Sequence, residues 1–170
     1  MTFFRPYTRT AKLSENGVYR HLLVREWDVE NRKSACFIML NPSTADATKD
    51  DPTIRKCIKF ARAWGCGRLL VVNLFDVRAT KPWFMKKHPE PVSDVNDSYV
   101  LLMAQKAFHN GGLVVCAWGM HGTHQDRNKT VLDMLTGAGI TLHALRLSNS
   151  GQPYHPLYQP DDAKPFVWTP

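Results

Sequence analysis

The chain has 170 residues, of which 44% are hydrophobic, and this is enough to build the core of one domain. Lys and Arg outnumber Asp and Glu by 22 to 15, and the formal charge of +7 favours polyanionic partners without establishing one. No stretch reaches the roughly 18 apolar residues of a membrane helix, and MTFFRPYTRT lacks the features of a signal peptide. We therefore expect a single domain over residues 1–170, in the cytoplasm and away from membranes.

The cysteine and histidine spacings predict no metal and no cofactor. The four cysteines are Cys36, Cys57, Cys66 and Cys116. None forms a C-x-x-C pair, and the first and last lie in apolar runs, where cysteine behaves as a small hydrophobic residue. His121, His124 and Asp126 have the right chemistry for a metal site, but their spacing fits no standard signature.

In chain order, the first predicted element is an antiparallel or edge strand over 18–28, where apolar and polar residues partly alternate. The continuous apolar run 35–40 suits a strand that is covered on both faces. A helix is predicted to begin at Asp50-Asp51-Pro52, because a carboxylate before a proline is typical of an N-cap followed by the first helical position. Apolar residues then recur at helical spacing until Gly65.

The remaining elements continue the alternation of strand and helix. Strands are predicted over 68–75, 112–118 and 141–147, and helices over 93–108 and 128–135. The proline-rich stretches 82–91 and 153–170 are interpreted as ordered loops or a tail that wraps the domain. This order predicts a three-layer α/β/α fold, with a mainly parallel four-stranded sheet plus an N-terminal edge strand.

Unusual polar segments follow the ends of these predicted strands. They are 40–46, 72–75, 117–122 and 152–156. Taken alone, Asn41-Pro42 could be a turn, Asn73 a buried amide and Trp118 a core aromatic residue. Because the carboxyl ends of parallel strands lie at one edge of a sheet, we expect the four segments to form one pocket.

Four short motifs in these segments resemble those of the uracil-DNA glycosylase superfamily. Leu40-Asn41-Pro42 resembles the first motif of the mismatch-specific branch, and Val72-Asn73-Leu74 is similar to the family's strand-end asparagine. Ala117-Trp118-Gly119 resembles the Leu-Trp-Gly of the uracil-specific branch, and His155-Pro156 resembles the start of the final His-Pro-Ser motif. The whole chain also resembles a bacterial and phage family marked by Leu-Asn-Pro-Ser-Thr-Ala-Asp, here residues 40–46, which has no established activity.

The glycosylase resemblance implies a parallel sheet between helices and a role for three residues. Asn41 would position the attacking water, Asn73 would hydrogen-bond the edge of a flipped base, and His155 would stabilise the departing base anion. An asparagine is a poor general base, so Asp46 is our candidate for a nearby carboxylate, with loop capping as an equally weighted alternative. Asp50 and Asp51 are explained by helix capping rather than by metal binding.

The other predicted site residues fall into two groups. The base-binding group consists of Asn73, Pro42, Ser43, Phe75, Trp118 and Gly119. The phosphate-binding group consists of Arg55, Lys56, Arg78, Lys81 and Arg127.

The leading hypothesis is a base- or nucleotide-directed enzyme, most concretely a DNA glycosylase-like N-glycosidic hydrolase acting on a damaged or modified base. Two alternatives stay open: a non-catalytic nucleic-acid-binding module that uses the same pocket, and an enzyme acting on free nucleotides. The expected partner is nucleic acid, with DNA favoured over RNA, or a nucleotide, and the oligomeric state is left open. A carboxylate within one water's reach of Asn41 would favour catalysis.

Overall fold

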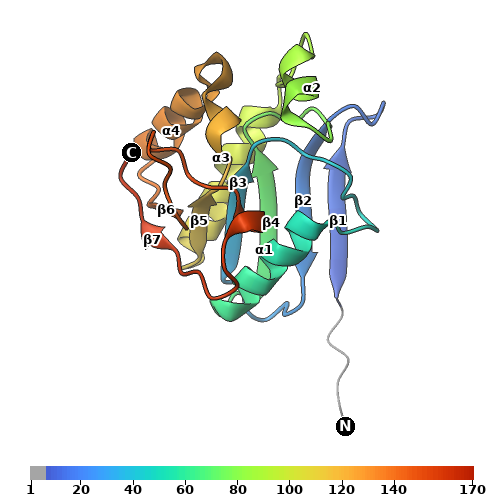
Figure 1. Ribbon diagram of the computed structural model, residues 1–170. Helices are drawn as coiled ribbons and strands as arrows, with labels where there is room; N and C mark the ends of the chain where they lie inside the picture. The colour runs from blue at the N-terminus through green and yellow to red at the C-terminus, as the bar shows by residue number, and fades with distance from the viewer. Residues whose placement is uncertain (1–6) are drawn as a thin grey trace.

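In the computed structural model, which describes residues 7–170, seven strands form one sheet in the order β1-β2-β4-β3-β5-β6-β7 (Figure 1). The strands are β1 (Thr8–Leu13), β2 (Arg20–Glu26), β3 (Ser34–Met39), β4 (Arg68–Asn73), β5 (Leu113–Cys116), β6 (Leu142–Ala144) and β7 (Phe166–Val167). The helices are α1 (Pro52–Ala63), α2 (Pro82–Lys87), α3 (Asn96–His109) and α4 (Arg127–Gly137), with 3₁₀ turns η1 (Met120–Asp126) and η2 (Pro156–Tyr158).

The α/β class is confirmed, but the sheet is mixed and has seven strands, whereas the prediction was a mainly parallel four-stranded sheet plus an edge strand. Strands β4, β3, β5 and β6 run parallel to one another, whereas β1, β2 and β7 pair antiparallel with their neighbours, so the sheet is mixed. The segment predicted as an antiparallel or edge strand is β2, which pairs antiparallel with both neighbours and lies inside the sheet between β1 and β4, not at its edge. Strands β1 and β7 were not predicted, because their residues are mostly exposed. They pair through backbone hydrogen bonds, which leave no apolar pattern in the sequence.

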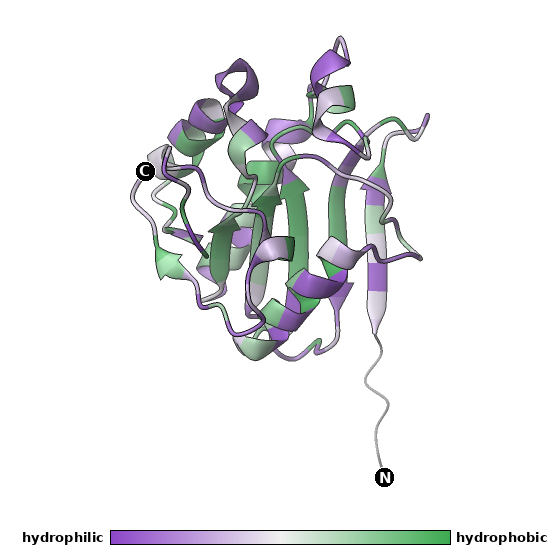
Figure 2. Cartoon of the chain, in the orientation of Figure 1, coloured by the Kyte–Doolittle hydropathy of each residue, from purple (hydrophilic) through white to green (hydrophobic). Residues whose placement is uncertain are grey.

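Helices cover both faces of the sheet, with α1 on one face and α3 and α4 on the other (Figure 1). Every residue of β3 is buried. Its side chains alternate: Cys36 and Ile38 pack in the cluster with α3 and α4, and Phe37 and Met39 pack in the cluster with α1. The central strands are mostly hydrophobic and the outer helix faces are largely polar (Figure 2). The continuous apolar run in the sequence is thus explained by burial on both sides.

Three helices begin and end within a few residues of their predicted bounds. Helix α1 begins as expected, because Oδ1 of Asp51 accepts the N–H of Ile54 at 2.9 Å and Pro52 occupies the first turn. Helix α2 was missed, since its six residues lie in a stretch that we interpreted as loop and its N-cap Lys81 makes no side-chain capping bond. Within residues 7–170, the structure contains no helix with the length and apolar character needed to cross a membrane.

A pocket at the strand ends

A pocket of about 570 Å³ lies beyond the carboxyl ends of the parallel strands, on the face that carries α1. Five segments contribute to its lining, together with the side chain of Arg20 from β2. They are residues 39–44, 51–54, 79–82, 118–121 and 154–158. Three of the four strand-end segments predicted to converge therefore do so, and the volume lies within the range of small-ligand sites.

Backbone hydrogen bonds between loops hold the pocket wall together. Ala79 donates its N–H to the carbonyl of Pro42 at 2.9 Å, and Gly119 donates to the carbonyl of Pro153 at 2.8 Å. Gly119 has φ of +74°, a conformation that a residue with a Cβ adopts only with strain. The segments from different strand ends are thereby joined before any ligand binds.

Asn41 lines the pocket with its amide group held in one orientation. Its Nδ2 donates to the carbonyl of Pro42 at 3.0 Å and to the carbonyl of Ala79 at 2.8 Å. Both amide protons are used, and Oδ1 accepts no hydrogen bond from residues 7–170. The arrangement leaves an acceptor oxygen for a water molecule or for a ligand.

His155 lines the same pocket and is also oriented by the backbone. Its Nδ1 accepts the N–H of Leu157 at 3.3 Å, which places the proton of the neutral ring on Nε2. Burial lowers the pKa of His155 below its ordinary value of 6.5, while the Asp51 carboxylate acts in the opposite direction. The ring is therefore a neutral hydrogen-bond donor at physiological pH.

Asp51 is the acidic side chain that the described residues place in the pocket lining. Its Oδ1 caps α1, and its negative charge opposes the burial that lowers the pKa of Arg20 and of His155. Asp51 was predicted from the sequence only as a helix cap, and its position in the pocket was missed. The signal was available in principle, because a helix that begins at the carboxyl edge of a parallel sheet directs its N-cap towards the ligand crevice.

Asp46 does not line the pocket. Its Oδ1 accepts the N–H groups of Thr48 and Lys49 at 2.8 and 2.9 Å and the Thr48 hydroxyl at 3.1 Å. These bonds lower its pKa. Its geometry is that of a loop cap, the alternative considered beside catalysis, and the pocket carboxylate comes from Asp51 instead.

The predicted base-binding residues divide between the pocket and the core. Ser43, Trp118 and Gly119 line the pocket. Trp118 is 1% exposed, and its Nε1 donates to Oε1 of Gln152 at 3.0 Å. A Cβ on Gly122 would lie 2.1 Å from the Trp118 ring, so glycine is needed there for the indole to pack.

Pro42, Asn73 and Phe75 lie deeper than the pocket. Pro42 is buried, and Phe75 belongs to the core on the α3 side, where its ring contacts that of His124. Asn73, at the end of β4, is 1% exposed, and both polar atoms of its side chain are buried without a hydrogen-bond partner among residues 7–170. Contact of Asn73 with a base stays a prediction, because it does not line the pocket.

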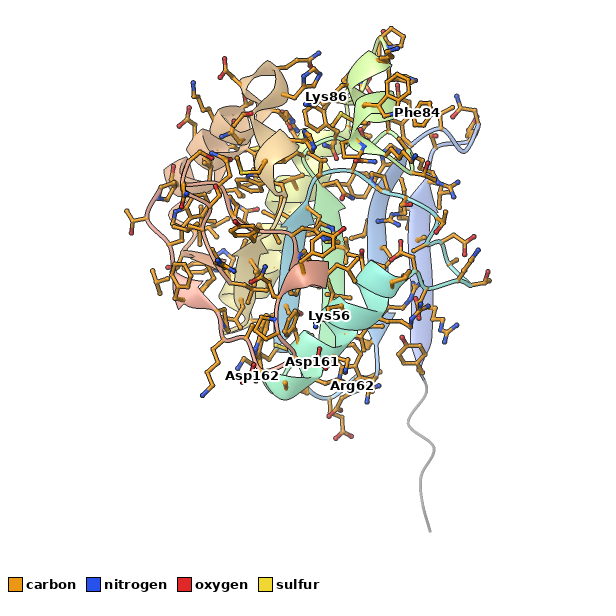
Figure 3. All side chains as sticks on the ribbon, viewed as in Figure 1. Lys56, Arg62, Phe84, Lys86, Asp161 and Asp162 are labelled. Atoms are coloured by element: carbon orange, nitrogen blue, oxygen red, sulfur yellow. The ribbon has the colours of Figure 1, made fainter. Side chains whose placement is uncertain are left out.

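Two of the predicted phosphate-binding residues already have charged partners. Arg127 is buried and donates to the carbonyl of Leu74 at 2.7 Å and to Asp97 at 2.5 Å. Lys56 pairs with Asp161 and so ties α1 to the C-terminal segment, as the labelled side chains show (Figure 3). The remaining three are Arg55, Arg78 and Lys81, which form no ion pair with the described residues.

The described residues contain no group of three or more His, Cys, Asp or Glu side chains arranged to hold a metal ion. His121 lines the pocket, whereas His124 packs against Phe75. The polar groups of the pocket lining include the amide of Asn41, the carboxylate of Asp51, the imidazole of His155, the guanidinium of Arg20 and several hydroxyl groups.

Comparison with known proteins places this pocket in a defined family. DUF1643, described as a protein of unknown function, matches residues 20–157. The chain belongs to the DUF1643 family. The matched range begins at Arg20 and ends at Leu157, so it contains the residues that line the pocket except Tyr158. No curated protein and no solved structure matches the chain.

Proposed function

We propose that this DUF1643 protein is a base-directed enzyme that hydrolyses an N-glycosidic bond of a damaged or modified nucleotide. The observation that carries the proposal is the convergence of three oriented groups on one pocket: Oδ1 of Asn41, Nε2–H of His155 and the carboxylate of Asp51. A carboxylate in the Asn41 pocket is the feature that separates catalysis from binding alone. The motif resemblance to uracil-DNA glycosylases supports the same chemistry.

Each group suits one requirement of the reaction. Water held by Oδ1 of Asn41 attacks the anomeric carbon, the carbon–nitrogen bond breaks, and its electron pair leaves with the base. One water proton passes to the free oxygen of Asp51 and is returned to the departing base, so the products are the free base and a sugar with a hydroxyl group. Nε2–H of His155 stabilises the negative charge that develops on the base, and the Asp51 carboxylate stabilises positive charge on the sugar.

Helix α2 supports a nucleic-acid substrate for this pocket. Its first residue, Pro82, lines the pocket, while Trp83 and Phe84 are 49% and 51% exposed and stack with their ring centroids 4.6 Å apart. Lys87 lies over the Trp83 ring at 4.2 Å. Phe84 and Lys86 project from the protein at this edge (Figure 3). Exposed aromatic rings beside lysines suit the stacking of unpaired bases and the binding of backbone phosphates.

The test is incubation of the protein with oligonucleotides that carry a panel of damaged and modified bases. Released base is measured by mass spectrometry, and retention of the oligonucleotide on a filter is measured in parallel. We expect release from at least one substrate and its loss in Asp51→Asn and His155→Gln. If oligonucleotides are retained on the filter but no base is released, the protein is a binding module. If no oligonucleotide is retained and no base is released, a nucleic-acid substrate is excluded.

A further inference from the structure

Arg20 is a buried cation at the pocket wall. It begins β2, is 2% exposed and is among the residues that line the pocket. Burial lowers its pKa to about 10, so the guanidinium still carries its charge at neutral pH. Removing such a charge from water is costly unless a partner compensates for it.

The described residues give Arg20 very little compensation. Its Nη1 donates to the carbonyl of Ala45 at 2.9 Å, its buried Nε has no hydrogen-bond partner, and no carboxylate of residues 7–170 lies within ion-pairing distance. Asp51 is the strongest of the charges that act on Arg20 and favours its charged form, whereas Arg78 and Arg25 oppose it. The guanidinium of Arg20 still has no ion-pair partner among residues 7–170.

Arg25, on the same strand, shows how a structural arginine is satisfied in this protein. It is 0% exposed, and its guanidinium makes five hydrogen bonds, four to backbone carbonyls and one to Asp50. Its Nε pairs with Oδ1 of Asp50 at 2.7 Å. Unlike Arg25, Arg20 has no carboxylate partner among residues 7–170, so its guanidinium is available to an anionic ligand.

The N-terminus of α1 is the second element of the same wall. Residues Pro52, Thr53 and Ile54 line the pocket, and the helix has 12 residues. Asp51 uses one carboxylate oxygen to cap Ile54, and the N–H of Thr53 donates to no residue within 7–170. A first-turn N–H and a buried guanidinium are both donors that suit the oxygens of a phosphate group.

We propose that Arg20 and the first turn of α1 form a phosphate site, so that the pocket binds a phosphorylated nucleotide rather than a nucleoside or a bare base. The inference rests on the proposed function for the identity of the base-bearing ligand. In this arrangement the phosphate lies beside Arg20, and the glycosidic bond lies towards Asn41, His155 and Asp51. The phosphate belongs either to a free nucleotide or to a nucleic-acid strand.

Calorimetric titration of the whole chain tests the site without any requirement for turnover. The ligands are inorganic phosphate, a nucleoside 5′-monophosphate, the matching nucleoside and a short single-stranded oligonucleotide. We expect a phosphorylated ligand to bind about 10- to 100-fold more tightly than the nucleoside, the factor that charge-assisted hydrogen bonds contribute. If the affinity for the monophosphate depends on Arg20, the ligand is a free nucleotide. If only the affinity for the oligonucleotide depends on Arg20, the ligand is a nucleic-acid strand.

Arg20→Met should bring this affinity ratio close to one while leaving the melting temperature unchanged or raised, because it removes an uncompensated buried charge. Arg62→Met is the matched control, since Arg62 lies at the far end of α1, stacks on Trp27 and is exposed (Figure 3). If Arg20→Met does not fold, Arg20→Gln, which retains a donor for the Ala45 carbonyl, replaces it.

Equal affinity of the wild-type protein for phosphorylated and unphosphorylated ligands would overturn the phosphate site. An unchanged ratio in the folded Arg20 variant would do the same. Base release is scored separately, so the two proposals can fail independently. If phosphate binding depends on Arg20 but no substrate releases its base, the phosphate site is supported and the hydrolase is rejected. If base release occurs but depends neither on Arg20 nor on the phosphate, the hydrolase is supported and the phosphate site is rejected.

Discussion

The backbone N–H of Leu157 donates to Nδ1 of His155 at 3.3 Å, and this bond determines which imidazole nitrogen is available to a ligand. The neutral ring must carry its proton on Nε2, so His155 can donate but not accept at that atom. His155→Gln should reduce turnover about 100-fold or more, because a well-placed donor to developing charge contributes that much to a rate. The fold should stay intact, since His155 is only partly buried in a loop. Single-turnover base release checks the rate and circular dichroism checks the fold, with the exposed His109→Gln as control.

Asp51 combines a structural and a chemical role that two substitutions can separate. Asp51→Asn keeps a good N-cap and should change the free energy of unfolding by less than about 1 kcal/mol, whereas Asp51→Ala should cost about 1 kcal/mol or more. Both variants lack the carboxylate, so both should lose turnover. Urea denaturation and base release are measured on the same preparations. Full activity in Asp51→Asn would show that the carboxylate only caps α1.

Asn41 should be harder to replace than a loop asparagine ordinarily is. Asn41→Ala removes two hydrogen bonds, to the carbonyls of Pro42 and Ala79, and should lower the free energy of unfolding by about 1–3 kcal/mol as well as abolish turnover. Asn41→Asp keeps an oxygen but places it against those carbonyls, so it should be the less stable of the two. Thermal denaturation ranks the variants, and the opposite order would mean that the amide is not held as described.

The exposed aromatic pair on α2 should contribute to strand binding. Trp83→Ala should weaken the binding of a single-stranded oligonucleotide by about 1–3 kcal/mol, the value of one base stacked on an aromatic ring. Its stability should hardly change, because Trp83 is 49% exposed. Fluorescence anisotropy at several salt concentrations measures the affinity, which should fall steeply as salt rises. Leu102→Ala, at an equally exposed apolar position on α3, is the control, and an equal loss in that variant would argue against stacking.

Stability should fall between pH 7 and pH 5. Burial lowers the pKa of His155 and of His143 below 6.5, so the folded state holds both rings neutral while the unfolded chain takes up protons below that pH. Their contribution is therefore complete above pH 6.5 and is lost as the pH falls towards the lowered values. The pKa values of Asp46 and Asp161 are lowered from 3.8, so these two groups change the stability only below pH 3.8, outside this window. Denaturation curves at pH 7, 6 and 5 should show a smaller decrease in His143→Gln than in the wild type.

The sequence alone was sufficient to predict the helices and strands that have a strong local pattern. The buried strand β3 follows from an apolar run, and the start of α1 follows from Asp51-Pro52, because burial and capping are encoded over a few neighbouring residues. The placement of Asn41 and His155 in one pocket could also be predicted from the sequence, because parallel strands bring their carboxyl ends to one edge of the sheet.

Tertiary structure decided the rest. The exposed strands β1 and β7 pair through backbone groups that every residue carries, so their sequences contain no distinctive pattern. The hydrogen-bond partners of a charged side chain depend on which segments pack against it. For this reason Arg25 has a carboxylate partner and Arg20, five residues earlier on the same strand, has none among residues 7–170. The same long-range packing turned Asp46 into a loop cap and left Asp51 as the pocket carboxylate, because partners distant along the chain determine what each residue type can do.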